Sequence, residues 1–265
     1  MKLLVAGANR VDAGKTTFSV GLVARTGATG FKPRAGNDFW FDHDDVLDAV
    51  ADARLYGKDA RRLAAASPGD PDPETINPIH RLWQPTPSGR PGLLGQADRS
   101  FVVDRVAGSF VVNDQLEVPQ VVREALPLDD AVRVSDLEAF NEVMATRHVA
   151  ALGAVERRIA DTEDAVVESY GDVARPLQGF EPDAVAVVQP HRARIYEGRR
   201  YVRACEVATG SPNTGKLEER VPTVLDSVEP TATVHLPAVG KETQSDPEAV
   251  ADAYAEAYDA LLAAV

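Results

Sequence analysis

The sequence predicts an α/β fold, a doubly wound, mostly parallel sheet with helices on both faces. Largely apolar runs at 2–6, 165–168 and 184–188 have the length and the hydrophobicity of strands that are buried on both sides. Segments with helical periodicity alternate with these runs, as a parallel sheet covered by helices requires. A chain of 265 residues, 44% of them hydrophobic, can form such a core without disulfide bonds, and its single cysteine excludes an internal one.

The first elements alternate strictly between strand and helix. After the first strand, a helix is expected over 16–26 and a second strand over 29–31. A longer helix is expected over 46–66, with Asp44 or Asp45 in position to cap its amino end. This strand–helix–strand order is the repeating unit of a parallel sheet.

The remaining elements are recognised by their turn and cap residues. Residues 67–92 are rich in Pro, Gly and Asp, which predicts a long and functional loop. A capping box at 135–138 opens a helix expected over 137–159. A late strand is expected over 231–236, and the last helix begins near Pro247.

The charge composition narrows the classes of partner. A net charge of −13 and a pI near 4.8 argue against a nucleic-acid-binding surface, which needs a basic stripe. No apolar run approaches the roughly 18 residues of a membrane span, and the short amino-terminal run is expected to be a strand instead of a signal peptide, so the expected location is cytoplasmic. Only six lysines stand against 22 arginines, and an acidic, lysine-poor composition is typical of proteins from halophilic organisms.

A phosphate-binding loop (P-loop) is predicted between the first strand and the first helix. Gly14 lets the backbone approach phosphate oxygens, the N–H groups at the helix start point at the anion, and Lys15 adds a full charge. Thr16 offers a hydroxyl group to Mg²⁺. The spacing is irregular, because Asn9 and not glycine stands six residues before Lys15. The expected nucleotide-binding residues are Asn9, Arg10, Val11, Asp12, Ala13, Gly14, Lys15, Thr16 and Thr17.

This motif sets the expected cofactors and domain organisation. A strand, a loop and a helix in this order make ATP and Mg²⁺ the expected cofactors. We expect a single P-loop nucleotide-binding domain over 1–265, with an irregular insertion around 99–134 in which 110–113 could be a strand and 118–126 a short helix.

The irregular loop is similar to the Gly-rich loop of dethiobiotin synthetase, and four further motifs resemble that family in the same order. They are Gly30-Phe31-Lys32-Pro33, Lys58-Asp59-Ala60, Thr75-Ile76-Asn77-Pro78 and Val166-Val167-Glu168. The resemblance covers roughly residues 1–190 and extends to the cobyrinic acid diamide synthases and the partitioning ATPases, which share this fold. In the partitioning ATPases a signature lysine stands where this sequence has Arg10.

The resemblance implies which residues carry the chemistry. It places Asp59 and Glu168 at the metal together with Thr16. It also implies that Lys32 contacts the acceptor or the transferring phosphoryl group, which makes Lys15 and Lys32 the expected catalytic residues.

The sequence departs from the family where the acceptor would bind. Gly36 stands in place of a substrate-binding serine, and Ser169-Tyr170-Gly171-Asp172 replaces the glycine-rich segment after the glutamate. The ATP and metal residues are therefore expected to be retained, while the pocket for the family's diamine substrate is rebuilt.

The expected function is that of a Mg-ATP-dependent, ligase-type enzyme that phosphorylates a carboxylate or carbamate of a small molecule. The alternative is a dimeric ATPase switch of the partitioning type that acts on a protein partner, and a third is an inactive nucleotide-binding scaffold. The expected partners are a small-molecule substrate and a second copy in a homodimer, with no nucleic acid and no membrane. The segment Asp42-His43-Asp44-Asp45 has two interpretations, a metal or substrate site and an acidic helix amino end.

Overall fold

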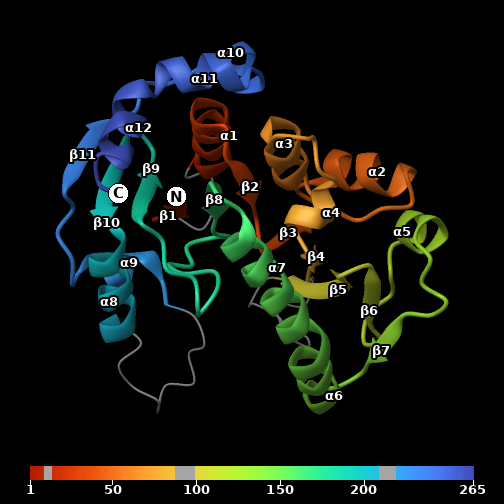
Figure 1. The fold of residues 1–265 in the computed structure, drawn as a ribbon. Coiled ribbons are helices and arrows are strands. Elements are labelled where there is room, and N and C mark those ends of the chain that lie inside the picture. The colour runs from red at the N-terminus through yellow and green to blue at the C-terminus, as the bar shows by residue number, and fades with distance from the viewer. Residues whose placement is uncertain (9–13, 87–98, 209–218) are drawn as a thin grey trace. The chain divides into compact units, whose positions relative to one another are not determined.

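The computed structural model describes residues 1–8, 14–86, 99–208 and 219–265, and the chain divides into two compact units. The first unit comprises Met1–Pro33, Arg62–Pro71 and Glu156–Val265, and the second comprises Arg34–Arg61 and Asp72–Val155. Each unit has its own sheet (Figure 1), so the α/β class is confirmed but the one predicted sheet is in fact two. No helix in the described ranges combines the length and apolarity that crossing a bilayer requires.

The sheet of the first unit has six strands in the order β11-β10-β9-β1-β8-β2. Strands β2, β8, β1 and β9 run parallel, whereas β10 is antiparallel to both of its neighbours. The strands are β1 (Lys2–Gly7), β2 (Thr29–Phe31), β8 (Ala165–Glu168), β9 (Ala184–Gln189), β10 (Arg192–Glu197) and β11 (Ala232–His235).

The parallel strands of this sheet are buried on both sides. All four residues of β8 are buried, and so are the first five of β9, so neighbouring side chains on opposite faces are both covered. Helix α1 contacts β1, β2, β8 and β9, and α12 contacts β9, β10 and β11. The helices of this unit are α1 (Lys15–Thr26), α8 (Gly198–Ala208), α9 (Val221–Leu225), α10 (Lys241–Ser245), α11 (Pro247–Ala253) and α12 (Ala255–Leu262).

Helix α1 has a glycine at each end and packs against the carboxyl-terminal helices. Gly14 before it and Gly27 after it both adopt left-handed backbone, with φ of 81° and 67°. Phe18 is fully buried and packs edge-on against the Tyr258 ring at 4.8 Å. A Cβ at Gly21 would lie only 2.5 Å from the Tyr258 hydroxyl, so the close packing of α1 against α11 and α12 needs glycine there (Figure 1).

The second unit contains a five-stranded mixed sheet in the order β3-β4-β5-β6-β7. The strands are β3 (Arg34–Asp38), β4 (Ile79–Pro85), β5 (Arg99–Val106), β6 (Ser109–Asn113) and β7 (Val132–Val134). Its helices are α2 (His43–Ala51), α4 (Pro73–Ile76), α5 (Gln120–Ala125), α6 (Leu137–Val143) and the π-helical turn η1 (Met144–His148). Helices α3 (Lys58–Ala66) and α7 (Val149–Asp161) carry residues of both units.

This second unit corrects several expectations about 46–134. The helix expected over 46–66 is two helices, α2 and α3, and Ala53 between them has a left-handed φ of 56°. The loop expected over 67–92 contains α4 and β4, and the irregular insertion expected around 99–134 contains β5 and β7 besides the strand and the short helix that the sequence indicated, which are β6 and α5. Because these strands pair with one another, they form a sheet of their own and do not extend the first.

Asp45 links α2 to α3 and is not the helix cap that the sequence predicted. Its Oδ2 atom accepts a hydrogen bond from the Lys58 backbone N–H at 2.8 Å and another from the Asn37 side chain. Burial raises the pKa of the Asp45 carboxyl above its ordinary value, and these hydrogen bonds offset only part of that rise.

The helix expected over 137–159 is interrupted by the π-helical turn η1. This turn places His148, which is buried, 2.8 Å from the Oδ2 atom of Asp104, and the same carboxylate accepts two hydrogen bonds of 2.6 Å from the Arg81 guanidinium. Burial alone would raise the pKa of Asp104, but Arg81 and His148 outweigh it and the net shift is downward. The interruption thus supplies one partner of a buried charged group.

The single cysteine gives a measure of how tightly the first unit is packed. Cys205 is fully buried, and burial together with the nearby Glu219 raises the pKa of its thiol to about 12. We expect no reaction of the native protein with iodoacetamide at pH 8, and labelling of one thiol per chain once the protein is unfolded in guanidinium. Because the unfolded thiol ionises near 8.5, this group should also make the folded state less stable as pH rises above about 8.5. Native labelling at the unfolded rate would contradict the packing of this region.

Candidate active site

The carboxyl ends of four parallel strands meet at one edge of the first unit's sheet. Val5 of β1 is level with Glu168 at the end of β8, and Phe31 at the end of β2 is level with Val167. Lys32 is the next residue after Phe31, so the register brings it beside Glu168. In open α/β sheets ligands bind at this edge, where loops leave the strands.

Glu168 is the centre of the polar contacts at this edge. It is fully buried, and its Oε1 atom accepts a hydrogen bond from the Thr16 hydroxyl at 2.9 Å. The same atom forms an ion pair with the Lys32 ammonium. Its Oε2 atom is also buried and has no hydrogen-bond partner among the residues that the structure describes. A buried carboxylate oxygen without a donor is costly, so this atom is suited to accept a cation or a donor from a ligand.

The first turn of α1 supplies the other groups of the predicted phosphate site. Lys15 is 9% exposed, and its ammonium donates a hydrogen bond of 2.8 Å to the carbonyl oxygen of Gly171. Gly14, in left-handed backbone, turns the chain into the helix, where the first N–H groups have no partner within the helix itself. This end of α1 therefore combines an ammonium group, a hydroxyl group and the helix dipole.

The structure brings together some of the predicted site residues and not others. Lys15, Thr16, Lys32 and Glu168 all belong to the first unit and are linked by the contacts above or are adjacent in α1. Asp59, the remaining predicted metal ligand, lies in α3 within the second unit, so its contact with Thr16 and Glu168 stays a prediction. Thr17 is half-buried in α1, while Asn9, Arg10, Val11, Asp12 and Ala13 lie outside the described residues.

The acidic segment 42–45 is used in local structure. Asp42 accepts the backbone N–H of Asp38 at 2.8 Å, and the His43 ring lies 3.1 Å from the Phe39 carbonyl oxygen. No cluster of three or more His, Cys, Asp or Glu side chains suited to a metal occurs in the described parts of the chain. The interpretation of this segment as a helix amino end therefore has the stronger support, since α2 begins at His43.

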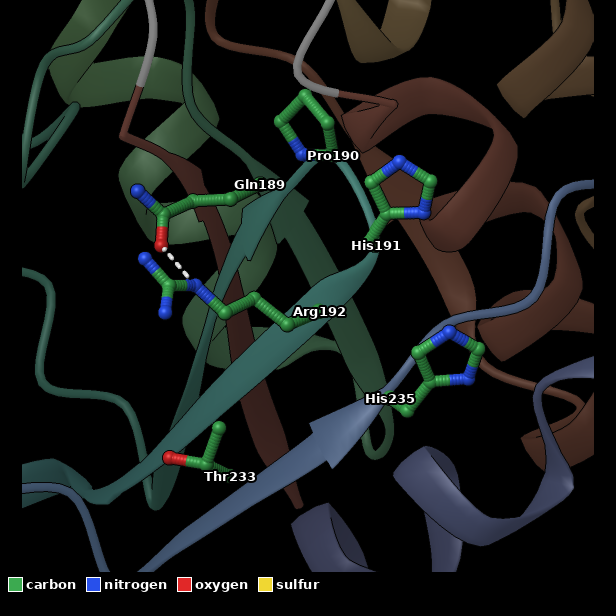
Figure 2. Close-up of a pocket in the computed structure, with 6 residues that line it drawn as sticks. All are labelled: Gln189, Pro190, His191, Arg192, Thr233 and His235. Atoms are coloured by element: carbon green, nitrogen blue, oxygen red, sulfur yellow. Dashed lines mark hydrogen bonds between the residues drawn. The ribbon is translucent and has the colours of Figure 1, made fainter.

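A shallow pocket of about 590 Å³ lies at the same edge of the first unit's sheet, where β9 and β11 end. Figure 2 shows the residues that line it, which are Gln189, Pro190, His191, Arg192, Thr233 and His235. The rings of His191 and His235 lie nearly parallel at 6.4 Å, and the Arg192 Nε atom donates to the Gln189 side-chain oxygen at 2.9 Å (Figure 2). The pocket thus offers flat ring surfaces beside hydrogen-bonding groups.

Val188 of β9, and not the pocket itself, lies next to the residues on either side of 9–13. The backbone N–H of Ala8, after β1, donates to the Val188 carbonyl at 3.2 Å, and a Cβ at Gly14 would come within 3.9 Å of the Val188 side chain. Gln189 of the pocket follows Val188 in β9, so the two side chains point to opposite faces of the sheet, and Arg192 and His235 share the face of Gln189. Neither His191 nor His235 was a predicted site residue, although His191 follows β9 and His235 ends β11, and a position at the carboxyl end of a strand was a usable signal.

The chain was compared with protein-family models, with curated proteins and with solved structures, and none of them matches it.

Proposed function

We propose that this protein is a Mg-ATP-dependent enzyme with a P-loop NTPase fold in its first unit, which transfers a phosphoryl group to a carboxylate or carbamate of a small molecule. The observation that carries the proposal is the convergence of Thr16, Lys32 and the buried Glu168 at the start of α1, beside Lys15. A hydroxyl group from the first helical turn and a carboxylate from the adjacent parallel strand are the pair with which P-loop NTPases hold Mg²⁺.

The residues of this site fit a magnesium ion. The Oε2 atom of Glu168 is buried without a partner in the described chain, and the Thr16 hydroxyl lies within hydrogen-bond distance of the same carboxylate. Both are oxygen ligands, the type that Mg²⁺ prefers, and a few protein ligands suffice because this ion keeps several waters and phosphate oxygens. Thr16 and Glu168 would hold the ion, which would supply positive charge to the β- and γ-phosphate oxygens.

The proposed reaction needs little covalent chemistry from the protein. An acceptor oxygen attacks the γ-phosphorus, the bond to the β,γ-bridging oxygen breaks, and ADP leaves with the electron pair. A nucleophile such as an amine then displaces phosphate from the mixed anhydride. Lys15 would bind the β- and γ-phosphates and Lys32 would orient the acceptor or the phosphoryl group in flight, so positioning and charge carry the rate.

The second candidate function is a nucleotide-driven switch, a dimeric ATPase that acts on a protein partner. Arg10, which stands where the partitioning ATPases have a signature lysine, favours it. Turnover that no small molecule stimulates, together with a dimer formed only with ATP, would support the switch over the ligase.

The proposal is tested through the magnesium dependence of ATP binding. Glu168→Gln keeps the shape of the side chain and removes its charge, and we expect the Mg²⁺ concentration for half-maximal ATP binding to rise about 10- to 100-fold. Glu163→Gln, the same change at an exposed position of the same unit, is the matched control. Titration calorimetry at fixed ATP measures the effect, and an unchanged magnesium dependence in the folded Glu168→Gln variant would contradict the metal site.

A further inference from the structure

The hydrogen bond between Lys15 and Gly171 connects the predicted phosphate site to a second part of the first unit. Gly171 lies three residues after Glu168 and adopts a left-handed backbone conformation with φ of 52°. That oxygen accepts the Lys15 ammonium at 2.8 Å. The group that a phosphate would need is thus already engaged by a backbone carbonyl.

The turn that carries Gly171 is itself fastened to residues 219–221. Val173 and Arg220 form an antiparallel bridge, and two backbone hydrogen bonds of 2.8 Å flank it, from Ala174 to the Glu219 carbonyl and from Val221 to the Asp172 carbonyl. The Arg220 guanidinium also pairs with the Asp172 carboxylate at 2.5 Å. The position of the Gly171 carbonyl is therefore set by Arg220 and Asp172 as well as by its own loop.

We propose that the Gly171 carbonyl and the phosphates of the nucleotide compete for the Lys15 ammonium, and that the Asp172–Arg220 pair sets this competition. Asp172 and Arg220 are then positioning residues, which act on the nucleotide only through Gly171 and Lys15. The inference rests on the proposed nucleotide site, and it adds that phosphate binding releases the turn 169–174 from α1.

The competition has a defined direction. A phosphate carries full negative charge and binds an ammonium group more strongly than a neutral carbonyl does, so the nucleotide displaces Gly171. A turn that Arg220 holds in place keeps the Gly171 carbonyl at the Lys15 ammonium and so opposes its replacement by phosphate. A turn that is held less firmly is displaced by phosphate more easily. Weakening the Asp172–Arg220 pair should therefore tighten nucleotide binding, while a merely structural support would weaken it.

The first measurement needs no nucleotide. Lys15→Met removes the donor to Gly171, and we expect faster hydrogen exchange at the backbone amides of Val173, Ala174 and Val221, whose hydrogen bonds hold the turn. Lys241→Met removes the same charge at an exposed position of α10 and is the control. Unchanged exchange at the three amides in folded Lys15→Met would overturn the proposal, whether or not the protein binds ATP.

The second measurement determines the sign of the coupling. Asp172→Asn and Arg220→Gln should each lower the Kd for Mg-ATP, by up to about fivefold for an ion pair of partial exposure. Glu163→Gln and Lys241→Met, which are exposed and lie outside the turn 169–174 and residues 219–221, should leave the Kd unchanged. An unchanged or raised Kd in the two test variants would overturn the coupling. If the parent protein binds no Mg-ATP, the proposed function fails. The hydrogen-exchange measurement then still tests whether the Lys15–Gly171 hydrogen bond holds the turn.

Discussion

Lys15→Ala is expected to abolish the binding of Mg-ATP. The ammonium of Lys15 is the full positive charge proposed for the β- and γ-phosphates, and it lies at the amino end of α1, where the helix dipole also favours an anion. We expect a loss of affinity of about 100-fold or more, which corresponds to about 2.7 kcal/mol. Titration calorimetry with Mg-ATP measures this loss.

Two variants separate a local loss of charge from a general effect. Lys241→Ala changes the net charge equally at an exposed position and should bind as the parent protein does. Arg10 belongs to the predicted loop and could replace part of the missing charge, so Lys15→Ala combined with Arg10→Ala should remove any residual affinity. Unchanged affinity in both the single and the double variant would contradict the phosphate-binding role of this loop.

The part of the site that could be predicted from sequence follows from the geometry of parallel strands. The first strand, the Gly-Lys-Thr turn and the strand at 165–168 are local patterns, and parallel strands place their carboxyl ends at one edge. The site role of Glu168 was implied by the resemblance to dethiobiotin synthetase, and its hydrogen bond from Thr16 agrees with this geometry. What the pattern could not predict is that Lys15 contacts the Gly171 carbonyl, because a backbone contact of this kind has no signature in residue types.

The second unit was missed because its core contains charged residues that sequence rules place on the surface. Arg105 of β5 is only 3% exposed, and its guanidinium donates to the carbonyl oxygens of Leu55 and Asn77, each at 2.6 Å. Burial lowers the pKa of Arg105 to about 10. Such a residue breaks the apolar pattern by which strands are recognised, and the proline- and glycine-rich flanks of β4 favoured a loop in the same way.

Lys32→Met is expected to lower the rate of substrate-dependent ADP release about 100- to 1,000-fold, the effect of losing one preorganised charge in a transition state. In the proposed mechanism Lys32 contacts the acceptor or the phosphoryl group in flight and not the resting nucleotide. The Kd for Mg-ATP should therefore stay within a few-fold of the parent value, while kcat falls.

The ion pair with Glu168 adds a structural cost that must be separated from this effect. Lys32 is 4% exposed and Glu168 is fully buried, so removing the ammonium leaves a buried carboxylate without its counter-ion. Breaking a buried pair of this kind typically costs about 3–5 kcal/mol of stability. Lys32→Arg keeps the charge and can keep the pair, so it should retain most of the stability while its larger, planar head group misplaces the contact needed for transfer.

The decisive comparison is kcat against stability across Lys32→Met, Lys32→Arg and the control Lys241→Met. If Lys32 acts in the reaction, Lys32→Arg is folded and stable yet loses most of its turnover with the best acceptor found in a metabolite screen at high salt. If Lys32 serves only the ion pair, total turnover falls only as far as the folded fraction falls, turnover per folded molecule is unchanged, and Lys32→Arg remains active. In an ATPase switch there is no acceptor, and Lys32→Arg should leave basal hydrolysis within a few-fold of the parent. A loss of ATP affinity with kcat unchanged would instead place Lys32 on the resting nucleotide, because a group that binds ground and transition states equally changes affinity and not the chemical step.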